Sequence, residues 1–224
     1  MTTADIDAVN GHILELGYKF PELWDNEFRA SLERTTAERA HQHVRQAQCE
    51  QGQQSAHARR AHELFGLKEQ FFQLNDELDR NKAGLALELL LNRLFELFEL
   101  KPRQPFRIIG EQIDGSLELD GQIYLMESKW EKRPLSEADL LVFKGKIEGK
   151  STFTRGVFIA LNDVSGEARD AITRGKTPSF FVMNGHDLMM VLYGSIDLKD
   201  FLRRRIRLLG EEGRVCAPFS ELGI

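Results

Sequence analysis

The fold is decided by residues 113–130, which read IDGSLELDGQIYLMESKW. Asp120 and Gly121 stand between two segments in which apolar residues recur at alternate positions. An Asp-Gly pair in this setting is typical of a two-residue β-hairpin turn. If these two residues form the turn, Leu119 pairs with Gln122, and the register of both strands is then defined along their whole length.

That register predicts a cluster of charge on one face of the hairpin. It sets Asp114 opposite Glu127 and Gln112 opposite Lys129, and alternation along a strand places Asp114, Glu127 and Lys129 on the same side. Directly opposed Cβ atoms lie ~4.5–5.5 Å apart, so the two carboxylates would repel each other unless a cation neutralised them. Hard oxygen ligands without His or Cys neighbours favour Mg²⁺ (or Mn²⁺) over zinc. Such a metal can lower the pKa of a bound water molecule and neutralise charge that develops on a phosphate. Lys129 is then placed to orient that water for attack and to stabilise the oxyanion of the transition state.

Helices and further strands surround this hairpin. The apolar segment Lys82–Leu100 predicts a core helix, with Glu88 in a polar stripe at helical spacing. Gly185-His186-Asp187 is interpreted as a turn and helix cap rather than a catalytic pair. The remaining predicted elements are the strands Phe106–Gln112, Asp114–Leu119, Gln122–Trp130, Arg155–Leu161 and Ser179–Met183, and the helices Leu135–Gly149 (opened by Ser136 with Asp139 at capping-box spacing), Gly166–Arg174 and Asp197–Leu209. This order predicts an α/β fold with a mixed central sheet flanked by helices.

Charge and composition divide the chain near residue 80. Residues 1–80 carry 9 Lys+Arg and 14 Asp+Glu, whereas residues 81–224 carry 21 of each. The segments Thr36–Arg60 and His62–Arg80 are rich in helix-forming residues and predict two helices of a long hairpin. Residues 1–80 are therefore expected to form a helical N-terminal region for homo-oligomerisation or partner binding, and 81–224 the second domain.

Residues 82–192 resemble a known family. Asp114-Gly115 followed by Glu127-Ser128-Lys129 looks like the signature of the PD-(D/E)XK nuclease superfamily, with Ile113 in place of the proline, and is closest to the Mrr-like restriction endonuclease branch. The resemblance implies a restriction-endonuclease-like fold and Mg²⁺-dependent hydrolysis of phosphodiester bonds in nucleic acid, with double-stranded DNA as the usual substrate and defence against foreign DNA as the role. Asp114, Glu127 and Lys129 would be catalytic, and Asp114 and Glu127 would bind the metal. Glu88 would be an accessory metal ligand; a solvated helix face explains it equally well.

Nucleic acid would need further contacts to its phosphates. The residues that we expect to supply them are Gln112, Lys144, Lys146, Arg203, Arg204 and Arg207. A solvated helix face explains the arginines as well, and a plain strand position explains Gln112.

Composition limits the alternatives. With 42% hydrophobic and 29% charged residues, the chain is typical of a globular protein, and no apolar run approaches the ~18 residues of a membrane span. The two cysteines, Cys49 and Cys216, are far apart and indicate reduced thiols in a cytoplasmic protein rather than a disulfide scaffold or zinc ribbon. The rival hypothesis, from another class, is a catalytically inactive interaction or scaffold protein that retains the nuclease fold.

Overall fold

The computed structural model describes residues 3–108, 110–174 and 177–223, although the side chains of most residues between 32 and 54, Cys49 among them, lie outside the described set. By its internal contacts the chain separates into two compact units, Met1–Arg59 and Arg60–Ile224. The domain boundary that the charge distribution predicts, at residue 80, lies about 20 residues after this division. The difference arises because Leu67 and Phe71 are buried in the core of the second unit.

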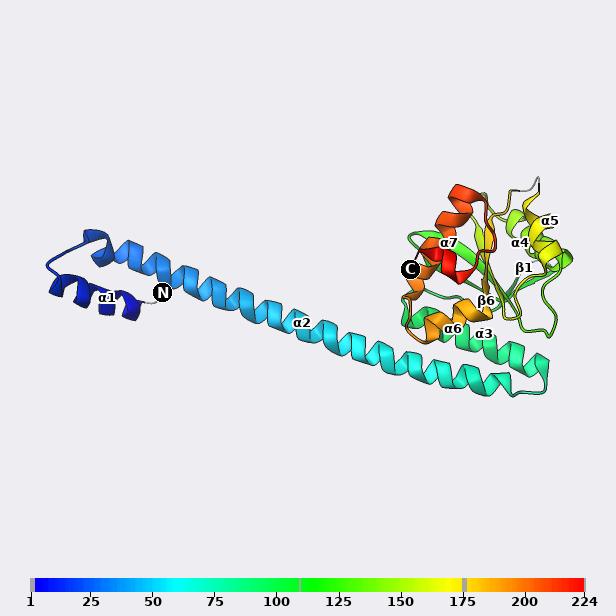
Figure 1. Cartoon of the computed structure of the whole chain (residues 1–224), viewed down its shortest axis with the longest axis horizontal. Helices are drawn as coiled ribbons and strands as arrows, with labels where there is room; N and C mark the ends of the chain where they lie inside the picture. The colour runs from blue at the N-terminus through cyan, green and yellow to red at the C-terminus, as the bar shows by residue number, and fades with distance from the viewer. Residues whose placement is uncertain (1–2, 109, 175–176, 224) are drawn as a thin grey trace. The chain divides into compact units, whose positions relative to one another are not determined.

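The first unit is helical. Helix α1 (Thr3–Glu15) and the 3₁₀ turn η1 (Pro21–Trp24) precede the long helix α2 (Asn26–Asn75), which continues past Arg59 (Figure 1). Asn10 of α1 donates to the carbonyl of Leu23 at 3.4 Å, and Asp7 forms an ion pair with Arg29 at 2.6 Å. These contacts fold α1 back onto the start of α2.

The prediction of separate helices over Thr36–Arg60 and His62–Arg80 is wrong, because α2 is continuous over most of that range. The only breaking residues inside it are Gly52 and Gly66, and a single helical glycine costs only ~1 kcal/mol relative to alanine. No helix among the described residues combines the length and apolar character that a bilayer span requires.

The second unit contains a four-stranded sheet in the order β3-β4-β5-β6. β3 (Gly115–Leu119) pairs antiparallel with β4 (Gln122–Lys129), whereas β5 (Arg155–Ala160) and β6 (Phe180–Asn184) continue the sheet in parallel. The predicted α/β fold with a mixed sheet flanked by helices is therefore confirmed. A separate two-stranded sheet precedes it, made of β1 (Phe106–Ile108) and β2 (Glu111–Ile113).

The prediction of a single strand over Phe106–Gln112 is wrong, because this segment forms the two short strands β1 and β2. Gly110 has φ +82°, a left-handed conformation that interrupts the extended chain between β1 and β2. Gln112 consequently pairs with Arg107 of β1 in the register of this small sheet. The ladder between β3 and β4 ends at Gly115 and Met126, so Gln112 is not paired with Lys129 and that prediction is wrong.

Helices cover both faces of the four-stranded sheet (Figure 1). On one face the core joins α3 (Arg80–Leu97), α6 (Gly185–Leu192) and α7 (Leu198–Glu212) to β-strand residues such as Tyr124 and Met126. On the other face α4 (Glu137–Glu148) and α5 (Gly166–Thr173) pack on Leu125 and Phe158. The expected helix cap at Gly185-His186-Asp187 is confirmed, because Asp187 completes a capping box with Asn184 at the start of α6.

Candidate functional site

The hairpin has the register that the sequence predicts. Leu119 pairs with Gln122, and Asp120 and Gly121 take φ values of +50° and +77°, as a two-residue turn with two left-handed residues requires. The ladder ends at the pair Gly115–Met126. Asp114 therefore stands just before the ladder, and its Oδ2 accepts the N–H of Ser128 at 3.0 Å. This bond holds the Asp114 carboxylate beside the end of β4.

Gly115 has a steric reason to follow Asp114. Its strand neighbour Ser116 exchanges two backbone hydrogen bonds with Arg103, at 2.9 and 3.2 Å. A Cβ atom on residue 115 would meet the Arg103 carbonyl oxygen at 2.8 Å, closer than a side chain allows. In the Asp-Gly pair, Asp114 thus supplies the carboxylate, and Gly115 allows the backbone at Arg103 to pack close to the strand.

Three carboxylates act on one another at this place. Burial raises the pKa of Asp114 and of Glu127, against opposing contributions from the Ser128 N–H and from Lys146. The pKa of Glu88, on α3, is raised to about 7 by burial first and then by the negative charges of Asp114 and Glu127. The structure therefore brings Glu88 into the electrostatic range of the hairpin carboxylates.

Lys146 of α4 makes direct contact with Glu127. Its Nζ lies 2.9 Å from Oε1 and 2.7 Å from Oε2 of Glu127. The helix comes this close because β5 carries a glycine at residue 156, where a Cβ atom would meet side-chain carbons of Ile147 and Phe143 at 2.3 and 2.8 Å. Packing of α4 on Gly156 thus places the ammonium of Lys146 over Glu127.

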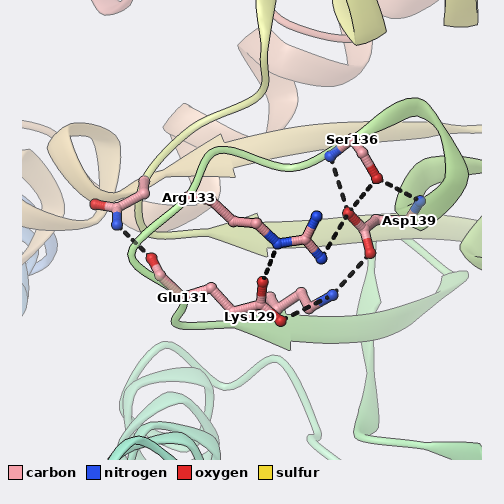
Figure 2. Close-up of polar contacts among 6 residues, drawn as sticks. Lys129, Glu131, Arg133, Ser136 and Asp139 are labelled. Atoms are coloured by element: carbon pink, nitrogen blue, oxygen red, sulfur yellow. Dashed lines mark hydrogen bonds and ion pairs between the residues drawn. The ribbon is translucent and has the colours of Figure 1, made fainter.

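Lys129, at the end of β4, is held by two other carboxylates (Figure 2). Its Nζ donates to Asp139 Oδ1 at 2.7 Å and forms an ion pair with Glu131 at 3.1 Å. Burial alone would lower the pKa of Lys129, but the bonds to Asp139 and Glu131 outweigh it, so the pKa is raised. The lysine is consequently a firmly protonated cation in this arrangement.

Asp139 connects that lysine to the start of α4. Its Oδ2 accepts the backbone N–H and the hydroxyl of Ser136, at 2.9 and 2.6 Å, and completes the capping box that the sequence predicts. Burial opposes ionisation of Asp139, yet the bonds from Lys129 and Ser136 lower its pKa to about 2. One carboxylate therefore caps the helix and binds Lys129.

The candidate nucleic-acid contacts are mostly engaged within the chain. Arg203 binds both carboxylate oxygens of Asp120 at 2.8 and 2.9 Å, and so braces the hairpin turn. The other partners are Glu148 for Lys144 at 3.1 Å, the carbonyls of Leu222 and Gly223 for Arg204 at 2.5 and 2.6 Å, Glu211 for Arg207 at 2.9 Å, and Arg107 for Gln112 at 3.4 Å. Lys146 is the member of this set that lies at the carboxylates.

Sequence reasoning missed the partners of both lysines. Lys146 lies three residues after the buried Phe143 and next to the buried Ile147, so helical periodicity along α4 could have placed it near the sheet. For Asp139 the capping-box spacing was visible, but its bond to Lys129 depends on where α4 meets β4. Among the side chains that the structure describes, which leave out most of those between residues 32 and 54, no three His, Cys, Asp or Glu groups lie close enough together to hold a metal ion by themselves.

Comparison with known proteins adds little to this geometry. No protein-family model and no curated protein matches the chain. A solved structure, titled "Crystal Structure of Protein of Unknown Function AF1548", aligns with a TM-score of 0.38 and 17% sequence identity. The alignment covers 54% of this chain and 76% of that chain.

Proposed function

We propose that the protein is a Mg²⁺- or Mn²⁺-dependent nuclease with a restriction-endonuclease-like fold, of the PD-(D/E)XK type, that cleaves phosphodiester bonds in DNA. The observation that carries this proposal is that the Asp114 carboxylate is held at the end of β4, within electrostatic range of Glu127, with Lys129 two residues further along the same strand. Asp114 is bonded to Ser128, the residue between the other two. A raised pKa for both carboxylates in a partly buried site is typical of a functional site.

The donor set fits a hard divalent cation. Mg²⁺ is commonly bound by one or two carboxylates together with waters and substrate phosphates, and Asp114 and Glu127 supply two such carboxylates. Glu88 lies within electrostatic range of both. Because the three carboxylates do not lie close enough together to ligate one ion by themselves, Glu88 would take its accessory role through a metal-bound water. A cation at this place would relieve the repulsion between the carboxylates, and when bound it would acidify a water molecule and neutralise charge on the phosphate.

The residues of the chain would then divide the work. Asp114 and Glu127 hold the cation, and the Ser128 N–H fixes the orientation of the Asp114 carboxylate. Lys129, kept protonated by Asp139 and Glu131, supplies positive charge where the oxyanion of the pentacovalent phosphate develops. Its fixed side chain orients the attacking water by donating a hydrogen bond to it.

The test is cleavage of plasmid DNA, linear duplex DNA and RNA by the purified chain, with Mg²⁺ or Mn²⁺ and with EDTA. Asp114→Asn and Glu127→Gln should remove cleavage and weaken metal binding, whereas Lys129→Met should remove cleavage and leave metal binding intact, because an ammonium is no ligand. We expect a loss of at least ~100-fold for each variant. Cleavage by Glu127→Gln at the parent rate would contradict the proposal.

A second candidate function is a non-catalytic interaction protein with the same fold. It is favoured by the engagement of both lysines: Glu127 is already neutralised by Lys146, and Lys129 by Asp139 and Glu131. The first unit would then carry the binding surface, since Leu16, Tyr18 and Phe20 are 74%, 65% and 50% exposed. Duplex DNA that is neither bound nor cut, in an otherwise folded protein, would favour this candidate.

A further inference from the structure

We propose that Lys146 is a built-in counter-ion whose ammonium occupies the place of the divalent cation at Asp114 and Glu127, so that metal binding requires its displacement. The inference rests on the metal-dependent function proposed above and deepens it, because it states what the site contains before a metal arrives.

Geometry is the first support. The Lys146 ammonium is bonded to both oxygens of Glu127, at 2.9 and 2.7 Å, so neither oxygen is left unengaged. The two side chains are only 16% and 22% exposed, so the pair is shielded from most of the solvent. Each of these oxygens keeps a second lone pair, but a metal ion that ligates both of them from the side of the ammonium has to replace the contacts of Lys146.

Charge is the second support. The positive charge of Lys146 acts on Asp114 as well as on Glu127, so it serves the pair of carboxylates as a shared cation would. Within the described part of the chain, no other side chain donates a hydrogen bond to Glu127. Lys129 is bound to Asp139 and Glu131 instead. Lys146 therefore neutralises Glu127 by direct contact and lowers the repulsion between two half-buried carboxylates.

Helix α4 provides a matched control for this role. Lys144 is also 16% exposed and also ion-paired, but its partner is Glu148 of the same helix, at 3.1 Å. Replacing either lysine with methionine removes one positive charge from α4 and keeps a side chain of similar length. Only the change at residue 146 removes a cation from the carboxylates of the hairpin.

The test is calorimetric titration of MnCl₂ into the wild-type chain and into Lys146→Met and Lys144→Met. Lys146→Met should bind Mn²⁺ about tenfold more tightly than wild type, because no ammonium has to be displaced, and Lys144→Met should stay within about twofold of wild type. Unchanged or weaker binding by Lys146→Met would overturn the inference and leave the proposed nuclease function standing. No Mn²⁺ binding by any of the three proteins would overturn both.

A measurement on the wild-type protein keeps the inference testable if Lys146→Met fails to fold. An N-hydroxysuccinimide ester acylates free amines, and mass spectrometry reports its rate at each lysine. Mn²⁺ should accelerate acylation of Lys146 severalfold and leave Lys144 unchanged, because displacement releases the ammonium from Glu127. Equal rates at Lys146 with and without Mn²⁺, at saturating metal, would contradict displacement.

Discussion

Glu88 shows how one residue makes the stability of the protein depend on pH. Its pKa of about 7 in the folded chain lies above the ordinary value of 4.5, because burial and the charges of Asp114 and Glu127 disfavour the carboxylate. The folded state therefore binds the proton more tightly than the unfolded state between these two pH values. Its contribution to the free energy of unfolding is complete below about pH 4.5 and is lost as the pH rises through 7.

Glu88→Gln should accordingly raise the free energy of unfolding more at pH 8, where the wild-type carboxylate is ionised, than at pH 5. We expect a gain of about 1 kcal/mol, less than the full pKa shift implies, because the side chain is partly exposed and solvent screens its charge. Urea denaturation at both pH values, in EDTA, measures it. Glu96→Gln is the matched control, since Glu96 is an exposed carboxylate on the same helix. An equal effect of both changes would mean that Glu88 is not coupled to the hairpin carboxylates.

At the scale of the element, α7 shows why its arginines could not be told apart from sequence. Arg203, Arg204 and Arg207 are exposed, whereas Arg205 is 2% exposed and binds Asp187 at 2.6 Å and the carbonyl of Ala217. Helical periodicity indicates which face a residue occupies, but the partners come from distant parts of the chain. The hairpin was predictable because its register follows from a local turn, and the contacts of α4 and α7 were not, because they depend on how helices dock.

Arg205→Leu should therefore destabilise the second unit strongly. The change leaves the carboxylate of Asp187 buried without its cation, a loss of about 3 kcal/mol. Arg207→Leu removes a charge from the same helix but only an exposed pair with Glu211, and should cost under about 0.5 kcal/mol. Chemical denaturation of both variants measures the difference. If the two cost the same, the buried pair contributes nothing beyond an exposed one.

At the scale of the whole molecule, the boundary between the units decides which fragments fold. Leu67 and Phe71 of α2 are 3% and 8% exposed in the core of the second unit. The ring of Phe71 stacks on the ring of Trp130, with centroids 5.5 Å apart. Trp130 directly follows Lys129, the last residue of β4. The last turns of α2 thus support the end of β4, although the charge distribution assigned them to the N-terminal region.

A fragment of residues 60–224 should therefore fold, and a fragment of residues 82–224 should be much less stable. Loss of Leu67 and Phe71 removes about 2–3 kcal/mol of burial for each side chain, which predicts a melting temperature lower by roughly 10–20 °C. Thermal denaturation followed by circular dichroism measures the difference between the fragments. Phe71→Ala in the longer fragment is the matched control and should reproduce a part of the decrease, whereas Phe72→Ala should have a smaller effect, because Phe72 is 40% exposed. Equal melting temperatures for the two fragments would mean that the folding unit begins near residue 80. They would also mean that α2 does not stabilise Trp130 and the end of β4.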